Sequence, residues 1–195
     1  MAPGPGVDVV AFGHEFQAGK SAFDVAVSGE CFEHDLYWRQ TFTNMVKCVR
    51  PGGLVVFTCA SLGRPEHGTT RTDASLSPGT QQVGIDYYRN LSEDDFSDLP
   101  LSRWFSEYRF WYMPTSMDLY FVGVRSGEGE TTASLPLDDD VQKIRLLMSG
   151  FHKAVRLPLR FAPRVSNPDT YQDLILPYWN LLLKVKNTFE TRGTS

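Results

Sequence analysis

In the first third of the chain, short apolar runs typical of strands are followed by a stretch in which apolar residues recur with the period of a helix. Residues 7–12 and the run from Phe23 to Ser28 are rich in β-branched side chains, and each predicts a strand. The second run is apolar on both faces except at Asp24, as expected of a buried parallel strand. Between residues 36 and 50, apolar positions recur at steps of three and four, which predicts an amphipathic helix with Asp35 as its N-cap.

A Pro51-Gly52-Gly53 turn is predicted to end this helix and to lead into a third strand over residues 54–60. Strand, helix, turn and strand form a βαβ unit, which implies a parallel sheet with a right-handed crossover. Residues 61–84 are rich in Gly, Pro, Ser and Thr and have no period. They predict a long loop, and loops of this length are often functional.

The second half of the chain begins with a helix-start signal. Ser92 is the expected N-cap, Asp95 stands at the third helical position, and Leu91 with Phe96 can form a hydrophobic staple. Two aromatic runs, residues 104–113 and 117–124, then predict an antiparallel pair of strands.

Beyond residue 126 the pattern changes from strands to helices. Residues 127–132 predict a linker, and helices are expected over residues 139–155 and 178–189, separated by a segment that holds three prolines. We therefore predict an α/β domain over residues 1–126 and a linker with a helical extension over residues 127–195.

Composition narrows the class of protein. The chain has 195 residues, of which 42% are hydrophobic and 22% charged, as in soluble globular proteins. A net charge of −4 gives no electrostatic footprint for nucleic acid or an anionic membrane surface. Three cysteines without a C-x-x-C pair predict neither a disulfide framework nor a metal site. Neither a signal peptide nor an apolar run long enough to span a bilayer is evident. We expect a cytoplasmic protein with no nucleic-acid or membrane partner.

Five stretches in a characteristic order carry a resemblance to a known family. They are GVDVVAFGHEF at residues 6–16, FDVAVSGECFEH at 23–34, VRPGGLVV at 49–56, RPEHG at 64–68 and DYYRNL at 86–91. Over about residues 6–125 the chain resembles the C-terminal two-thirds of a class I S-adenosylmethionine-dependent methyltransferase. The resemblance implies an α/β, Rossmann-like three-layer sandwich, truncated at its N-terminal side and followed by a C-terminal helical appendage.

The family's first strand and glycine-rich loop, and its second strand with an acidic end, have no counterpart here. Met1 falls about where that second strand would have just ended. In the family's strand order, 3-2-1-4-5-7-6, their loss leaves residues 7–12 without a partner and makes the strand from Phe23 to Ser28 an exposed edge. We expect residues 7–12 to shift beside that strand, or a second copy or partner chain to cover the edge.

The resemblance also implies which residues form the site. Near the cofactor S-adenosylmethionine it places Phe12, Gly13, His14, Ser28, Gly29 and Glu30. Glu33 and His34 would face the acceptor pocket, and His67, with Arg64 and Glu66, would bind the acceptor or remove its proton. Each has a plainer alternative: a core aromatic for Phe12, a polar loop residue for His14, an ordinary strand-to-helix turn for residues 28–34, and a solvated loop for residues 64–67. Tyr87, Tyr88 and Arg89 would form a pocket wall or a packed connector.

The implied function is methyl transfer from S-adenosylmethionine to a small-molecule or sugar-containing (glycan-type) acceptor, impaired in this chain alone. Methyl transfer is an in-line displacement from a sulfonium, so orientation supplies most of the acceleration, and a base (His34 or His67) is needed only when the acceptor must lose a proton. Two alternatives remain open. One is a non-catalytic remnant or interaction module with the same fold, and the other is one half of a split enzyme.

Overall fold

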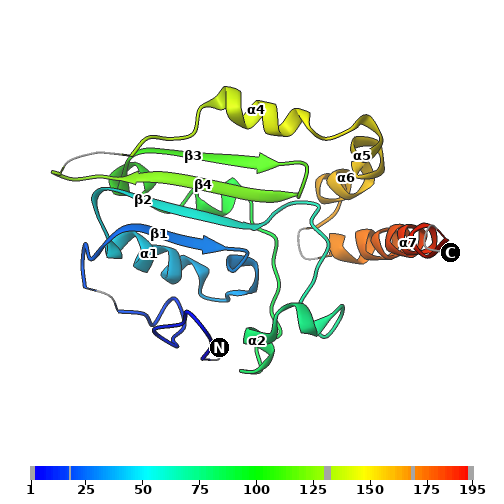
Figure 1. Cartoon of the computed structure of the whole chain (residues 1–195), viewed down its shortest axis with the longest axis horizontal. Coiled ribbons are helices and arrows are strands. Elements are labelled where there is room, and N and C mark those ends of the chain that lie inside the picture. Colours follow the sequence, from blue (N-terminus) through cyan, green and yellow to red (C-terminus); the bar gives the residue numbers. More distant parts are fainter. Residues whose placement is uncertain (1–2, 18, 130–132, 168–169, 193–195) are drawn as a thin grey trace.

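The fold centres on one mixed sheet of four strands. The computed structural model describes residues 3–17, 19–129, 133–167 and 170–192. Within them the sheet has the order β1-β2-β4-β3 (Figure 1), built from β1 (Phe23–Gly29), β2 (Val49–Ala60), β3 (Phe105–Met113) and β4 (Asp118–Arg125). Strands β1 and β2 are parallel, whereas β4 is antiparallel to both β2 and β3. The predicted βαβ unit and the antiparallel pair of aromatic strands are thus confirmed. The strand order corresponds to the last four strands, 4-5-7-6, of the order 3-2-1-4-5-7-6 given above.

The crossover helix α1 (Trp38–Cys48) is shorter than predicted, because β2 starts at Val49 and contains the Pro-Gly-Gly segment. The prediction of a turn there was wrong. A Cβ on Gly53 would lie 2.4 Å from the backbone oxygen of Asp24, so glycine lets β2 approach β1 closely where the register between the strands shifts. Asp35 is not the N-cap. Its carboxylate accepts hydrogen bonds from the Tyr37 N–H and the Thr41 hydroxyl instead.

The main core fills one face of the sheet beneath α1. Phe42, Phe57, Phe96 and Phe121 are fully buried and contact one another edge-on or stacked. Phe96 belongs to η3 (Glu93–Phe96), whose capping box between Ser92 and Asp95 is present as predicted. The short helix α3 (Leu101–Trp104) then leads into β3.

The other face of the sheet is covered only in part. Helix α4 (Asp138–Leu146) lies over β3 and β4, where Val141 packs against Trp111 and Met113. Over β1 the face is open, since Val25 is 47% exposed and Val27 70% exposed. The prediction of a strand buried on both faces was wrong, whereas the exposed edge that the resemblance implied is found at β1 among the described residues.

Residues 7–12 form neither a strand nor a partner for β1, so both expectations for this segment were wrong. Within the described ranges no strand pairs with residues 7–12, so this apolar run lacks the backbone hydrogen bonds between neighbours that make a strand. The segment runs as irregular chain with Val7, Val9 and Val10 about half exposed, and ends in a turn at Phe12.

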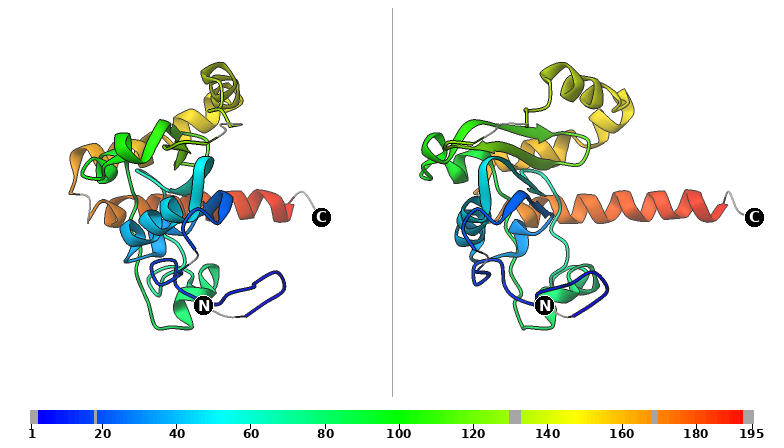
Figure 2. Two further views of the ribbon diagram at one scale, coloured as in Figure 1. Left: turned by 90° about the vertical axis from the view of Figure 1, so that its left-hand side faces the viewer. Right: turned by 60° about the vertical axis from the view of Figure 1, so that its left-hand side comes forward.

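The described residues of the C-terminal part also form the helices α5 (Gly150–Val155), α6 (Leu157–Val165) and α7 (Tyr171–Arg192). The helix expected over residues 139–155 is interrupted, since Ser149 caps α5. Helix α6 forms where a proline-rich connection was expected, and α7 starts seven residues earlier than predicted. Helices α6 and α7 share a buried cluster with Met117 at the start of β4. Figure 2 shows α7 extending well beyond the sheet. Among the described residues, no helix has the length and apolar character to cross a membrane.

Candidate active site

The site begins where β1 ends. Chain direction changes at Glu30, which adopts a left-handed φ of 49°, and the short helix η1 (Phe32–His34) follows at once. This turn buries Glu33 completely and leaves His34 only 7% exposed. Neither carboxylate oxygen of Glu33 has a hydrogen-bond partner among the described residues.

The long loop after β2 brings His67 to the same place. One ligand-type atom from each of Glu33, His34 and His67 lies within 4.8 Å of the others, and we refer to these three residues as the Glu33 cluster. The rings of His34 and His67 meet edge-on with centroids 5.2 Å apart, and the Tyr88 ring contacts both. The sequence analysis placed these three residues on the acceptor side, but in two separate segments of the chain. The structure brings them together.

Gly68 makes this approach possible. Its φ is +71°, and a Cβ on it would lie 2.9 Å from Cε1 of His34 and 2.6 Å from the Cβ of Ser77. Only glycine combines that backbone conformation with so little space. The 61–84 loop also forms two short helical turns beyond this point, η2 (Ala74–Leu76) and α2 (Pro78–Gln81).

Both histidines are oriented by backbone carbonyls. Nδ1 of His34 lies 3.4 Å from the Tyr87 oxygen, and Nδ1 of His67 lies 3.2 Å from the Pro65 oxygen. A neutral imidazole that donates from Nδ1 keeps a free lone pair on Nε2. The Tyr88 hydroxyl also donates to the Pro65 oxygen, over 3.3 Å.

Burial dominates the electrostatics of the cluster. Burial is the main cause that raises the pKa of Glu33 to about 8, and the nearby charges of Glu30 and Asp118 act in the same direction. The backbone N–H groups of Glu33 and Ala60 partly oppose this rise, although they lie outside hydrogen-bonding geometry with the carboxylate. Burial also lowers the pKa of His34, as does the neighbouring His67. Without a metal, the uncharged forms of Glu33 and His34 are thus favoured.

The C-terminal helix α7 fixes the loop that carries His67. The Gln172 side-chain amide donates to the Arg64 oxygen over 2.9 Å and accepts from the Glu66 N–H over 3.0 Å. Arg71 forms ion pairs with both Glu66 and Asp173 of α7. Sequence reasoning missed Gln172, since a single glutamine in an amphipathic helix gives no local signal of a contact with a loop so distant in the chain.

A cavity of about 460 Å³, the His67 cavity, opens beside this loop. Arg64 and Glu66, both expected on the acceptor side, line it together with His67. Both are already paired, Arg64 with Asp118 at 3.3 Å and Glu66 with the Thr69 hydroxyl at 2.6 Å. The C-terminal part contributes Arg156 and Trp179, and Leu76, Ser116 and Met117 also line the cavity.

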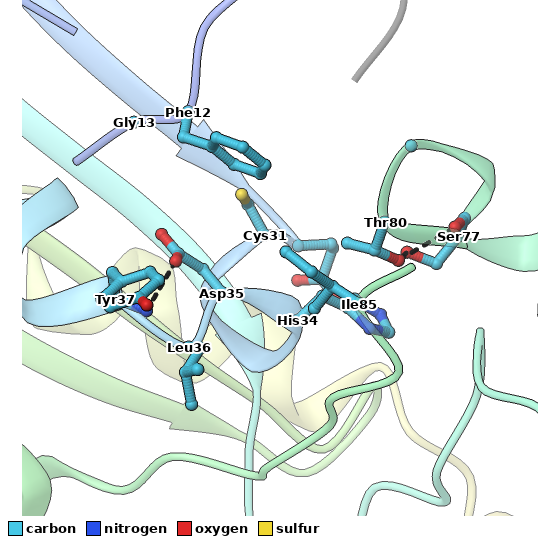
Figure 3. Close-up of a pocket in the computed structure, with 12 residues that line it drawn as sticks. Phe12, Gly13, Cys31, His34, Asp35, Leu36, Tyr37, Ser77, Thr80 and Ile85 are labelled. Atoms are coloured by element: carbon cyan, nitrogen blue, oxygen red, sulfur yellow. Dashed lines mark hydrogen bonds between the residues drawn. The ribbon is translucent and has the colours of Figure 1, made fainter. Parts of the chain in front are cut away.

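A second cavity, the Phe12 cavity, measures about 220 Å³ and lies at the carboxyl end of β1 (Figure 3). Of the residues expected near the cofactor, Phe12, Gly13 and Glu30 line it, and His34 lines it as well. Figure 3 shows Ser77 and Thr80 of the long loop on the side opposite Asp35 and Tyr37. Since His34 borders this cavity and His67 borders the other, the Glu33 cluster stands between the two.

Three of the expected cofactor residues do not line the Phe12 cavity: Ser28, Gly29 and His14. Ser28 and Gly29 pair with β2 as ordinary strand residues. The His14 ring packs on the Tyr37 ring with centroids 4.2 Å apart. The Asn44 amide donates to the backbone oxygens of Gly13 and His14, and so ties this segment to α1.

The neighbouring residues have mainly supporting roles. The backbone N–H of Arg89 donates to the backbone oxygen of Glu33 over 2.8 Å and its guanidinium pairs with Asp95, so Arg89 belongs to a packed connector. Desolvation by surrounding protein atoms, with the charges of Asp35 and Glu33, raises the pKa of Cys31 to about 11. The Cys31 thiol therefore stays protonated at neutral pH, which excludes it as a ready nucleophile.

Comparisons with known proteins give distant structural likenesses. No family model and no curated protein matches the chain. Phosphoethanolamine N-methyltransferase 2 of Haemonchus contortus, solved with phosphomonomethylethanolamine and S-adenosylhomocysteine, is similar over 60% of this chain and 36% of its own, with 13% identity and a TM-score of 0.44. A Thermotoga maritima S-adenosylmethionine-dependent methyltransferase, described as a possible histamine N-methyltransferase, is similar over 60% of this chain and 62% of its own, with 10% identity and a TM-score of 0.40. At these identities and TM-scores the likenesses do not assign the chain to a family.

Proposed function

We propose that this protein takes part in S-adenosylmethionine-dependent methyl transfer to a small-molecule or sugar-containing acceptor. The observation that carries the proposal is the arrangement of two cavities on either side of the His34–His67 contact. Three of the six residues expected near the cofactor line one cavity together with His34, and three residues expected near the acceptor line the other. Two reactants held on opposite sides of one contact meet the need of a displacement reaction for close, oriented partners.

The Phe12 cavity would hold the cofactor, which supplies an activated methyl group on a sulfonium when bound. Phe12 offers an apolar ring, and Glu30 offers a carboxylate at the end of β1, where open α/β sheets place their ligands. The cavity's volume of about 220 Å³ lies below the roughly 300–1,000 Å³ of most small-molecule pockets. It fits part of the cofactor, so we expect weak binding by this chain alone.

The His67 cavity would hold the acceptor. Trp179 offers an aromatic face on which the apolar side of a sugar or another ring could pack, and Arg156 offers hydrogen-bond donors. When the acceptor must lose a proton, His67 and His34 lie at the junction of the two cavities and could receive it.

That a second copy or a partner chain covers the β1 edge stays a prediction. The exposed valines of β1 and its unpaired backbone give such a chain both apolar surface and hydrogen-bonding groups. A strand added there would extend the sheet beside the Phe12 cavity and could complete the cofactor site.

Calorimetric titration of the 195-residue chain with S-adenosylhomocysteine tests the proposal. We expect binding in the high-micromolar to millimolar range, weakened about 5- to 10-fold by Phe12→Ala, because the ring loses its contact with the ligand. Phe151→Ala removes a ring of the same kind that is 73% exposed and remote from the site, and should leave the affinity unchanged. A folded chain that gives no heat at millimolar ligand would contradict the proposal and favour a non-catalytic interaction module.

A further inference from the structure

The Glu33 cluster contains a buried carboxylate with no counter-charge. Glu33 is 0% exposed, and neither of its side-chain oxygens accepts a hydrogen bond within the described part of the chain. Burying a carboxyl group without donors is costly, and native structures usually pair such groups.

The nearby arginines do not supply the missing counter-charge for Glu33. Arg64 pairs with Asp118, Arg71 with Glu66 and Asp173, and Arg89 with Asp95. No ion pair in the described ranges reaches Glu33, although three arginines lie on the elements around it. The Glu33 carboxyl group is thus buried by packing and takes part in none of these ion pairs.

The two imidazoles beside Glu33 are arranged as metal ligands usually are. In metal sites, a histidine that binds through one ring nitrogen commonly donates from the other nitrogen to a carboxylate or a backbone carbonyl. Here Nδ1 of both His34 and His67 lies within hydrogen-bonding reach of a backbone oxygen.

From this geometry we infer that Glu33, His34 and His67 form a binding site for one divalent transition-metal cation. Two imidazoles and one carboxylate suit Zn²⁺, Fe²⁺, Co²⁺ or Mn²⁺, and three protein ligands leave coordination positions open for water or substrate. The ligand atoms, now within 4.8 Å of one another, need to close by up to about 1.5 Å to reach usual coordination distances.

The inference departs from the sequence analysis, which predicted no metal site. Adjacent Glu-His residues followed by a histidine in a distant loop do not form a spacing motif, and only folding brings them together. The site goes beyond the proposed function and does not depend on it. Its place between the two cavities would let a bound cation polarise an acceptor oxygen or nitrogen from the His67 side.

The test uses Co²⁺ as a spectroscopic probe and Zn²⁺ in calorimetry, on full-length protein freed of metal with a chelator. We expect one Co²⁺ per chain, with visible absorption typical of nitrogen and oxygen ligands. His67→Gln should weaken binding at least about 10-fold, since even partners of metal ligands are worth 10- to 100-fold in affinity. His152→Gln makes the same change at an exposed histidine on α5 and should bind as the wild type does.

Failure of the wild-type chain to bind either ion at 1 mM, or equal binding by His67→Gln and the wild type, would overturn the inference. A second measurement needs no variant of the site. Co²⁺ should broaden the imidazole NMR signals of two of the four histidines in the wild-type protein, and the His152→Gln spectrum identifies one signal that must stay sharp. Broadening of the His152 signal alone would assign the ion to a surface position instead. Neither measurement involves S-adenosylmethionine, so a failed methyl-transfer assay leaves the metal site standing and the reverse also holds.

Discussion

The two sides of the His34–His67 contact differ in how completely the chain encloses them. On the His67 side, the loop is hydrogen-bonded to α7 through Gln172, linked to it again through Arg71, and faces a cavity of about 460 Å³. On the Phe12 side, the cavity is about half that volume, and β1 beside it is an exposed edge.

This difference separates a part of the site that the chain completes by itself from a part that it does not. The geometry of the His67 side depends on contacts between segments far apart in the chain. The Phe12 side depends on an irregular segment that is tied to α1 by the Asn44 amide and packs through His14 on Tyr37. Substitutions on the His67 side should therefore affect folding and metal binding. Substitutions on the Phe12 side should affect ligand affinity or association with another chain.

The largest effect is expected from Glu33→Gln, which replaces the buried carboxyl by a neutral group of similar shape. The raised pKa of Glu33, about 8 against an ordinary 4.5, means that folding favours the protonated form. The metal-free wild type should thus lose stability as pH rises from about 4.5 to about 8, on the order of a few kcal/mol. Thermal unfolding at pH 6 and pH 9 should show this loss in the wild type and not in the variant.

Added Zn²⁺ should stabilise the wild type and not Glu33→Gln, because the variant lacks one metal ligand. At pH 9 the wild type should then become the more stable of the two proteins. Glu107→Gln makes the same change on an exposed position of β3 and should unfold like the wild type. A wild-type stability that does not fall between these pH values would show that Glu33 has a partner in solution.

Gly68→Ala should separate His67 from His34. The added methyl group meets both His34 and Ser77 at a backbone φ of +71°, and we expect a cost of about 2–4 kcal/mol. Gly84→Ala is the matched control, because its φ is +72° with nothing within 4 Å, so it reports backbone strain alone, about 1–2 kcal/mol. Urea unfolding and Co²⁺ titration measure the two effects, and equal losses for both variants would argue against close packing at Gly68.

Asn44→Ala should loosen the Phe12 side without disturbing the Glu33 cluster. The amide donates to the oxygens of Gly13, His14 and Phe16, so its loss should cost about 1 kcal/mol and speed hydrogen exchange over residues 13–17. Co²⁺ affinity should stay the same. Gln40→Ala, at an exposed position of the same helix, should change neither. Unaltered exchange in Asn44→Ala would mean that other contacts hold the segment.

The smallest effect on stability is expected from Val27→Lys. Val27 is 70% exposed, so the cost should stay below about 0.5 kcal/mol in the monomer. If a second copy covers the β1 edge, sedimentation should show concentration-dependent association of the wild type and none of the variant. A wild-type chain that stays monomeric at high concentration would contradict a homodimer and leave a different partner chain as the candidate.

Local sequence signals predicted the sheet well. The β-branched runs, the Ser92 capping box and the aromatic pair gave the strands and their neighbours within about two residues, except at β2. There the glycines allowed Val49 to join the strand early. Residues 7–12 failed for the opposite reason, because strand propensity alone does not form a strand without a partner.

The sequence could predict which residues belong to the candidate site, but only in part which contacts they make. Glu33, His34 and His67 could be named as candidates, but a one-dimensional sequence could not show that Glu33 would be buried without a partner. Nor could it place Gln172, because the contact depends on how α7 packs against a loop and not on any pattern near residue 172.

The hydrogen bond from Gln172 to Arg64 joins residues 108 positions apart. The sheet can pair its strands from residues 23 to 125, but the loop bearing His67 gains this support only after the last helix has been synthesised and has docked. Contacts between residues so distant in the chain require loop closure before they form, which makes them slow steps in folding. During translation the core can therefore form before the site does, and a chain that ends before α7 would carry a folded sheet with an unanchored His67 loop.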